Sequence, residues 1–190
     1  MQDLLHNIKQ CTICAEHLAL GPRPIVSAHP ESKIVIIGQA PGIKVHTTGI
    51  PWDDASGKQL RKWLNVSNKE FYDETKFAII PMGFCYPGKG KTGDLPPRPE
   101  CAPQWHKPLL NQLKNVKLVI LIGMYAQKYY LGKTAKNTLT ETVDNFQDYL
   151  PKYLPLPHPS PRNRFWLTKN PWFEIDVLPV LRERVKIINA

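Results

Sequence analysis

Four cysteines stand at spacings that could hold a metal ion or a metal cluster. Cys11 and Cys14 form a C-x2-C pair near the N-terminus, and Cys85 and Cys101 form a C-x15-C pair in mid-chain. Thiolates in such a pattern can bind one zinc ion tetrahedrally or hold a [4Fe–4S] cluster. The second spacing is too long for a compact zinc site, in which both pairs are tight, so a cluster held partly by a long loop fits better. The alternative is four buried thiols without any metal.

A glycine-rich turn is the second candidate for chemistry. It reads Gly38-Gln39-Ala40-Pro41-Gly42 and follows the apolar run Ile34–Ile37. Glycines in such a turn let backbone amides approach a ligand closely. The turn lacks the lysine of a P-loop and the spacing of a dinucleotide-binding motif, so binding of ATP or NAD is not expected. Considered alone, it is an ordinary strand-to-helix turn.

An aromatic residue beside two carboxylates forms the third candidate. Trp52, Asp53 and Asp54 lie within the segment Gly49–Gly57, before a predicted helix. Either aspartate can activate a water molecule, and the tryptophan can stack on a flat base. The alternative is structural, because an aspartate at a helix N-terminus is favoured by capping and by the helix dipole. For one of the two aspartates the structural role is the better interpretation.

A histidine between prolines is the fourth candidate. The segment His158-Pro159-Ser160-Pro161-Arg162-Asn163 is stiffened by its two prolines. His158 held in this way can donate a hydrogen bond to a leaving group, while Ser160, Arg162 and Asn163 can contact a phosphate. A lone histidine is often structural, and that alternative stays open.

The chain is strongly basic. Lys and Arg number 25 against 16 acidic residues, which gives a net charge of +9. A basic surface of this size suits a polyanionic partner such as DNA, although solubility alone is the simpler explanation. Within the segment Lys89–Asp94, Lys89 and Lys91 are candidates for contacting phosphates. The alternative for this segment is a solvated loop.

Length and composition predict a single cytoplasmic domain. A chain of 190 residues is expected to form one domain, residues 1–190, and a monomer is the default. No apolar run approaches the ~20 residues needed to cross a membrane, and the first residues do not resemble a signal peptide. In a reducing compartment, the cysteines are expected to be ligands or free thiols rather than disulfides.

The order of predicted elements indicates an α/β fold. Four short apolar runs predict strands, and the segments between them predict helices. We expect strands at 34–37, 77–80, 118–122 and 153–157, and helices at 56–64, 105–113, 125–131 and 176–187, with a short helix in 1–20 that carries the first cysteine pair. Alternating strands and helices favour a three-layer α/β/α domain, in which a mostly parallel four-stranded sheet has helices on both faces.

The candidate residues follow the predicted strands. Gly38–Gly42, Met82–Gly90, Gly123 and His158 each come directly after one. Ligands bind at the carboxyl ends of the strands in such sheets, so we expect these segments to meet on one rim. The 19 prolines crowd into 81–108 and 151–161, which predicts long ordered loops there.

Taken together, these motifs resemble those of the uracil-DNA glycosylase superfamily, and most closely those of its iron–sulfur branches and of an uncharacterised bacterial group within it. The branches carry C-x2-C, a GEAPG-type turn, G-x-PF-x-G-x-x-G, C-x14–17-C and HPS in that order, and this chain matches collinearly over about residues 8–165. Three positions differ. Gln39 replaces a glutamate, Ala40 stands where the best-studied branch has a water-activating aspartate, and Pro81 replaces the asparagine that reads uracil. Trp52 replaces the stacking phenylalanine.

The resemblance implies flipping of a damaged base out of DNA and hydrolysis of its N-glycosidic bond. It implies that His158 and the turn amides at Gln39 and Ala40 stabilise the departing base, and that Trp52 stacks on the base. Asp53 or Asp54 would activate the water, with Gln39 orienting it. The remaining residues that it implies are Gly38, Pro41, Gly42 and Met82 around the base, Lys89, Lys91, Ser160, Arg162 and Asn163 on the DNA, and the four cysteines on a [4Fe–4S] cluster that braces two loops.

Three other functions remain open at this stage. Ala40 and Pro81 favour a nucleic-acid-binding module that kept the fold and lost the chemistry. A hydrolase or transferase acting on free nucleosides or nucleotides is another, although it would not need a charge of +9. The last is an interaction protein stabilised by zinc, which metal analysis would distinguish.

Overall fold

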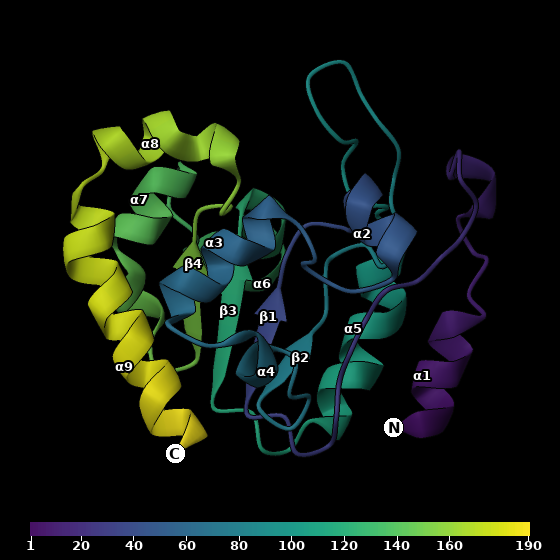
Figure 1. Cartoon of the computed structure of the whole chain (residues 1–190), viewed down its shortest axis with the longest axis horizontal. Helices are drawn as coiled ribbons and strands as arrows, with labels where there is room; N and C mark the ends of the chain where they lie inside the picture. Colours follow the sequence, from purple (N-terminus) through teal and green to yellow (C-terminus); the bar gives the residue numbers. More distant parts are fainter.

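The computed structural model describes residues 1–190 and is built on a parallel sheet of four strands. The strands are β1 (Ile34–Ile37), β2 (Phe77–Ile79), β3 (Leu118–Ile122) and β4 (Tyr153–Leu156), in the spatial order β2-β1-β3-β4. They are continuous apolar runs, buried except for the first residue of β4, as expected for parallel strands that are covered on both faces. The predicted α/β fold is therefore confirmed (Figure 1).

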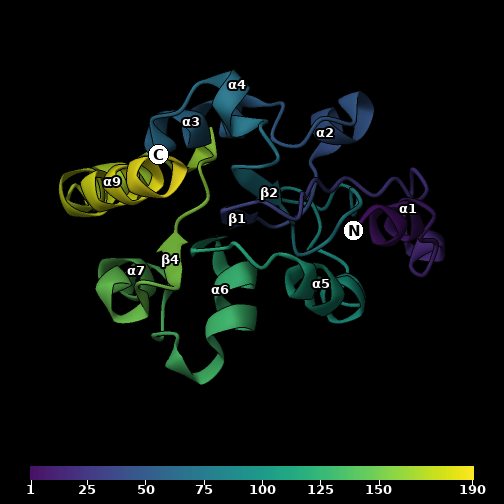
Figure 2. The same ribbon diagram turned by 90° about the horizontal axis from the view of Figure 1, so that it is seen from below.

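Helices cover both faces of the sheet, as the view along it shows (Figure 2). Ile34 and Ile36 point into a core cluster that includes residues of α3 and α9, while Val35 and Ile37 point into a second cluster with residues of α1, α5 and α6. The alternation of side chains along a strand produces these two cores. The helices are α1 (Gln2–Lys9), α2 (Ile43–Thr48), α3 (Ala55–Leu64), α4 (Asn68–Phe71), α5 (Cys101–Gln112), α6 (Met124–Leu131), α7 (Leu139–Asp144), α8 (Arg164–Lys169) and α9 (Leu178–Asn189).

Helix boundaries differ from the prediction in two places that matter for the cysteines. Helix α1 ends at Lys9, so Cys11 and Cys14 lie in the turns that follow it and not on the helix. These turns are closed by hydrogen bonds from Cys11 N to Ile8 O and from Ala15 N to Thr12 O. The expectation that a helix carries this pair was wrong, because short-range turn bonds replace the helical pattern after Lys9.

Helix α5 begins at Cys101, four residues before the predicted start, and occupies the end of the proline-rich stretch 81–108. The expectation of a loop throughout that stretch was therefore wrong at its end. Pro103 lies in the first turn, where the missing N–H would have no helical partner anyway. Pro155 lies in β4, an edge strand, where a missing donor is also tolerated.

A loop between β2 and α5 projects beyond the rim of the sheet and is the most extended segment of the molecule (Figure 1). We call residues 87–97 the arm. Its base is a small antiparallel bridge between Lys89 and Asp94. None of the helices has the length and apolar character that crossing a lipid bilayer requires.

His106 is a buried histidine that links the second core to the rim. It is 1% exposed, one ring nitrogen (Nε2) lies 2.9 Å from the Pro81 carbonyl oxygen, and the other (Nδ1) lies 2.5 Å from the Tyr130 hydroxyl. Burial lowers the pKa of His106 from 6.5 to about 4, because the charged imidazolium would lose its hydration. The side chain is therefore neutral at pH 7.

This burial predicts a pH-dependent stability. The unfolded chain binds a proton at His106 below about pH 6.5, whereas the folded chain does so only near pH 4, so stability is lost as the pH falls through that window. Between pH 7 and pH 5, His106 should lower the free energy of unfolding by about 2 kcal/mol. Urea titrations of the wild type and of His106→Gln measure this. The variant should be less stable at pH 7 and should lose less stability on acidification, and equal slopes would contradict the assignment.

Candidate active site

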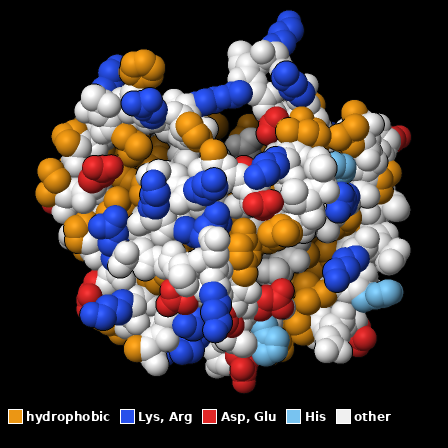
Figure 3. Space-filling view, viewed as in Figure 1, with side chains coloured by type: hydrophobic (Ala, Val, Ile, Leu, Met, Phe, Trp, Pro, Cys, Tyr) orange, Lys and Arg blue, Asp and Glu red, His pale blue; other side chains and the backbone are white.

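A cleft of about 360 Å³ lies at the carboxyl ends of the strands. Figure 3 shows the hollow between the arm and the side of the molecule that carries α8. Segments far apart in the sequence meet there. The predicted site residues that line it are Gly38, Gln39, Ala40, Pro41, Gly42, Trp52, Asp54, His158, Ser160 and Arg162. Met82 and Gly123 also follow strands but do not line the cleft.

The glycine-rich turn forms the floor of the cleft and is fixed to the segment after β2. Met82 N donates to Gly38 O at 2.9 Å, and Gly83 N donates to Gln39 O at 3.0 Å. A side chain at Gly38 would place its Cβ only 2.8 Å from Cζ2 of Trp52. Residue 38 must therefore be glycine for the indole ring to lie against the turn.

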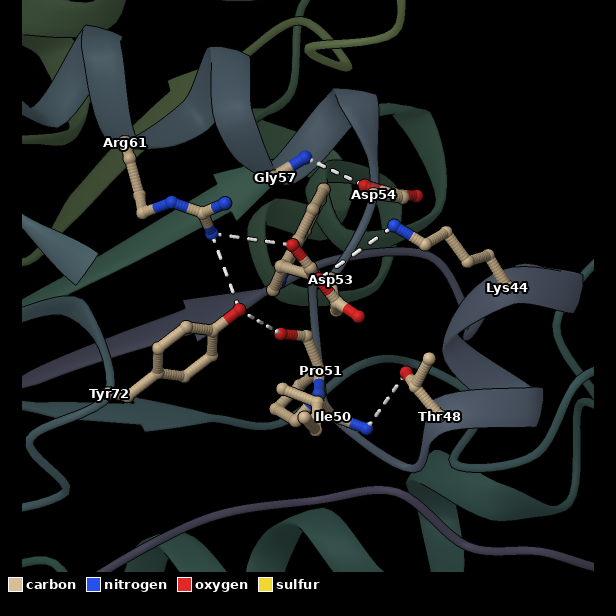
Figure 4. Close-up of polar contacts among 10 residues, drawn as sticks. Lys44, Thr48, Ile50, Pro51, Asp53, Asp54, Gly57, Arg61 and Tyr72 are labelled. Atoms are coloured by element: carbon tan, nitrogen blue, oxygen red, sulfur yellow. Dashed lines mark hydrogen bonds and ion pairs between the residues drawn. The ribbon is translucent and has the colours of Figure 1, made fainter. Parts of the chain in front are cut away.

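Trp52 has a strained backbone. Its φ of 57° is in the left-handed region, which bulky residues rarely adopt. Two side chains hold this segment. Arg61 Nη1 donates to the Trp52 carbonyl oxygen at 3.3 Å, and the Tyr72 hydroxyl donates to Pro51 O at 3.0 Å (Figure 4). Trp52 is 9% exposed, and its indole ring lies 5.8 Å from the His158 ring, centroid to centroid. Strain that is held in place at a cleft is typical of a functional position.

The two neighbouring aspartates have different surroundings. Asp54 Oδ1 accepts a hydrogen bond from Gly57 N at 2.7 Å and caps α3, while the residue also lines the cleft. Asp53 lies outside the cleft lining and forms an ion pair with Lys44 at 3.8 Å (Figure 4). Of the two candidates for water activation, the fold brings only Asp54 to the cleft.

His158 is half-buried on the wall of the cleft that follows β4. Loss of hydration lowers its pKa, although the nearby carboxylates of Asp54 and Asp94 oppose this shift. At pH 7 the ring is therefore neutral and presents one N–H donor. Asn163 Nδ2 donates to the His158 carbonyl oxygen at 2.7 Å, so the Asn163 amide braces the histidine segment.

Arg162 connects the histidine segment to the arm. Its Nη1 donates to the Thr92 carbonyl oxygen at 3.2 Å, across 70 residues of sequence. Ser160 Oγ accepts a hydrogen bond from the Arg162 backbone N–H at 3.2 Å, and this bond closes the turn from Ser160 to Arg162. Lys89 and Lys91 are exposed on the arm and do not line the cleft. The basic residues expected on DNA therefore surround the mouth of the cleft.

Two cleft residues from the arm were not expected. Asp94 and Leu95 line the cleft opposite the glycine-rich turn. The sequence offers one signal, since Asp94 is the only acidic residue in a basic, glycine-rich loop. The reverse holds for Met82, which was expected to contact a base. It is 7% exposed and packs in the second core cluster, while only its backbone N–H supports the turn.

The four cysteines lie near one another, where the turns after α1 meet the segment after β2 and the start of α5. Cys14 and Cys85 pack in one cluster with Leu18, and Cys101 Sγ accepts a hydrogen bond from Phe84 N at 3.3 Å. Burial, together with the neighbouring thiols, raises the pKa of Cys85 to about 11 and that of Cys101 to about 12. All four are free thiols.

Four free thiols are the kind of donor set that a [4Fe–4S] cluster takes, with one thiolate on each of its four irons. No group of three His, Cys, Asp or Glu side chains is arranged to hold a metal ion in this structure. The chemistry of the four side chains therefore fits a cluster, while their arrangement does not form a metal-binding group.

The chain is similar in sequence to known proteins. Residues 26–182 match the sequence profile of the Uracil DNA glycosylase superfamily, a span that contains the turn, Trp52 and His158. The chain is also 27% identical over 165 residues to the Type-4 uracil-DNA glycosylase of Thermotoga maritima, covering 84% of this chain and 81% of the relative.

Proposed function

Because the chain belongs to the uracil-DNA glycosylase superfamily, we propose that it is a DNA glycosylase that hydrolyses the N-glycosidic bond of uracil or another deaminated base. The observation that carries the proposal is the meeting of the Gly38–Gly42 turn, Trp52 and His158 in one cleft. The similarity to a Type-4 uracil-DNA glycosylase supports it. A target nucleotide would leave the helix stack and enter this cleft, since the bond is not accessible inside a duplex.

The cleft residues suit the two demands of this reaction. The departing base carries growing negative charge, and the neutral His158 ring and the amides of the turn can donate hydrogen bonds to it. The Trp52 indole offers a flat surface for stacking. Asp54, or Asp53 beyond the cleft lining, was expected to activate the water, with Gln39 orienting it. The location of Asp54 on the cleft favours it over Asp53.

The basic surface suits the DNA backbone. Lys89 and Lys91 project on the arm, and Ser160 and Arg162 lie at the mouth of the cleft. Below the cleft, Lys58, Arg61 and Lys62 line a shallow groove that contains no acidic residue. Figure 3 shows positive side chains gathered over α3 on this face. Together they form a path along which phosphates can be neutralised while the base occupies the cleft. Asn163 braces His158 in the unbound protein, so its proposed DNA contact would use the remaining atoms of its amide.

Base release from oligonucleotides tests the proposal. Anaerobically purified protein is incubated with strands that carry uracil, hypoxanthine, xanthine or a thymine mispair, single-stranded and double-stranded. Release of uracil or hypoxanthine is the expected result. Retained salt-dependent binding without release of any base would favour a non-catalytic nucleic-acid-binding module, for which the alanine at position 40 and the proline at 81 are the supporting observation. Cleavage of free nucleosides without oligonucleotide binding would favour a hydrolase of free nucleosides or nucleotides.

We also propose that Cys11, Cys14, Cys85 and Cys101 hold a [4Fe–4S] cluster in a cytoplasmic monomer. The ligands come from the N-terminal turns, the segment after β2 and the start of α5. A cluster would fasten these segments to one another beside the arm. Its contribution would be structural, since hydrolysis transfers no electrons. Loading would release protons, because the buried thiols hold theirs at neutral pH.

The cluster predicts a brown protein. Anaerobic preparations should absorb near ~400 nm and contain about four irons per chain. Cys101→Ser should lose the colour and part of the stability, because metal binding contributes directly to folding. Thr12→Ala, between the first two cysteines, is the matched control and should stay brown. A colourless, iron-free wild type prepared without oxygen would refute the cluster, and bound zinc would support the alternative metal.

A further inference from the structure

Asp94 of the arm is a carboxylate on the cleft that the proposed mechanism has not yet used. We infer that it is the general base that takes the proton of the attacking water. This inference rests on the proposed glycosylase function and deepens it. The glycine-rich turn itself offers no general base, because the amide of Gln39 and the methyl group of Ala40 cannot accept a proton. His158 is needed in its neutral form as a donor to the base.

Three aspartates lie near the cleft, and their surroundings separate them. Asp53 is outside the lining and is paired with Lys44 at 3.8 Å. Asp54 lines the cleft, but one of its oxygens is held by the Gly57 N–H at 2.7 Å as the cap of α3. Asp94 lines the cleft, forms no ion pair, and has a single long hydrogen bond, from the Tyr86 hydroxyl to Oδ1 at 3.4 Å. Its Oδ2 accepts no hydrogen bond from the protein.

The Asp94 carboxylate lies next to Gly42 at the end of the turn. A Cβ at residue 42 would lie 3.5 Å from Asp94 Oδ2, which is an ordinary van der Waals distance. Asp94 remains solvent-exposed on this wall, which gives it access to water before DNA covers the cleft.

The arm is held so that Asp94 stays in place. Leu95 N donates to Gly88 O at 2.8 Å and Gly90 N donates to Gly93 O at 2.6 Å, which closes a small hairpin around it. Arg162 donates to Thr92 O at 3.2 Å from the opposite wall. Among titratable or charged groups, the Tyr86 hydroxyl contacts Asp94, and the charge of Asp94 acts on His158. Arg162 Nη1 lies beside the neighbouring Gly93, and Lys89 is the bridge partner of Asp94 across the hairpin. Since Lys89 and Lys91 are on the same hairpin, DNA held by the arm would keep the carboxylate over the cleft.

The proposed step balances with water as the only co-reactant. The water oxygen forms a bond to C1′ of the sugar as the C1′–N bond to the base breaks. The bonding electron pair leaves with the base, which His158 and the turn amides stabilise. The water proton passes to the Asp94 carboxylate and later to the released base. The products are the free base and an abasic site, and Asp94 returns to its anionic form.

Single-turnover base release by aspartate variants tests this inference. Asp94→Asn should lower the rate by ~10²-fold or more, as expected when a general base is lost. Asp94→Glu keeps a carboxylate and should recover part of the rate. Asp53→Asn should be close to the wild type. Asp54→Asn changes the other carboxylate of the cleft and keeps the cap of α3, because asparagine caps a helix as well as aspartate does, so its rate shows whether Asp54 takes part. Oligonucleotide affinity and melting temperature of Asp94→Asn should match the wild type, which separates a chemical role from a structural one.

The outcomes distinguish this inference from the function on which it rests. An Asp94→Asn rate within about threefold of the wild type would overturn the inference and leave the glycosylase intact. A large loss in Asp54→Asn alone would assign the proton transfer to Asp54. A wild type that releases no base from any substrate would remove the proposed function and, with it, this role for Asp94.

Discussion

Replacing His158 with alanine should lower the rate of base release by ~10²-fold or more. The histidine lies on the cleft wall with its ring 5.8 Å from that of Trp52, and loss of hydration lowers its pKa so that it is neutral at pH 7. A neutral imidazole suits a leaving base that becomes negatively charged, because its N–H can donate a hydrogen bond to the base and the ring needs no change of protonation state beforehand. The loss should appear in the chemical step, measured under single-turnover conditions, with little change in oligonucleotide affinity.

Two further variants make this result specific. His29→Ala changes a histidine that only closes a local turn with Glu31 and Ser32, and it should act like the wild type. Asn163→Ala removes the hydrogen bond to the His158 carbonyl oxygen and leaves the imidazole in place. It should cause a smaller loss than His158→Ala, as expected for a residue that only positions another. Equal rates for His158→Ala and the wild type would exclude His158 from the reaction.

The parts of this site that the sequence predicted are those encoded by local pattern. The run Ile34–Ile37 marks a buried strand by itself, and the turn after it must lie at the strand's carboxyl end. The same holds for β4 and His158, so the parallel sheet places both segments at the same rim, with β3 between β1 and β4. For the first cysteine pair the sequence predicts a helix, and this is wrong. The short-range turn bonds after Lys9 leave no periodic pattern in the sequence that would mark the end of the helix.

Other parts depend on contacts between distant segments, which no local pattern reports. Asp94 reaches the cleft because the arm folds over the rim and Arg162 holds it from 70 residues away. Met82 follows a strand as the turn does, yet its side chain points to the opposite core. Asp53 and Asp54 are adjacent in sequence, and only the direction of the chain at the start of α3 determines which of them faces the cleft. Which of these side chains faces the cleft is determined by packing between distant segments and not by the spacing of residues along the sequence.

The segment around Trp52 depends most on such packing, and Gly57 is where it can be tested. A Cβ at residue 57 would lie 1.7 Å from the Trp52 carbonyl oxygen and 2.7 Å from its carbonyl carbon. These are backbone atoms, which Arg61 also holds from the other side, so no side-chain rotation relieves the overlap. Glycine is required here for space, since only a hydrogen fits between α3 and the strained residue.

Gly57→Ala should therefore lower both stability and activity. Alanine favours a helix over glycine by about 1 kcal/mol, and in an open helix the change would stabilise the protein. Here the overlap must push Trp52 away from the helix, and overpacking of this kind costs roughly 1–3 kcal/mol, which offsets or exceeds the gain. The displaced indole would no longer lie against Gly38 and His158, and a shift of about 1 Å at a catalytic site can lower a rate by ~10²-fold.

Activity and stability should thus separate in a characteristic way. Gly57→Ala should lower the rate of base release far more than it lowers the melting temperature. The higher helix propensity of alanine offsets part of the strain on stability, but it does not correct the displacement of the Trp52 indole in the cleft. Gln59→Ala, two residues along the same helix, changes helix propensity without approaching Trp52 and should keep the wild-type rate. A Gly57→Ala variant that is both more stable and fully active would mean that the left-handed Trp52 can move aside freely. In that case its strained conformation would have no part in holding the base.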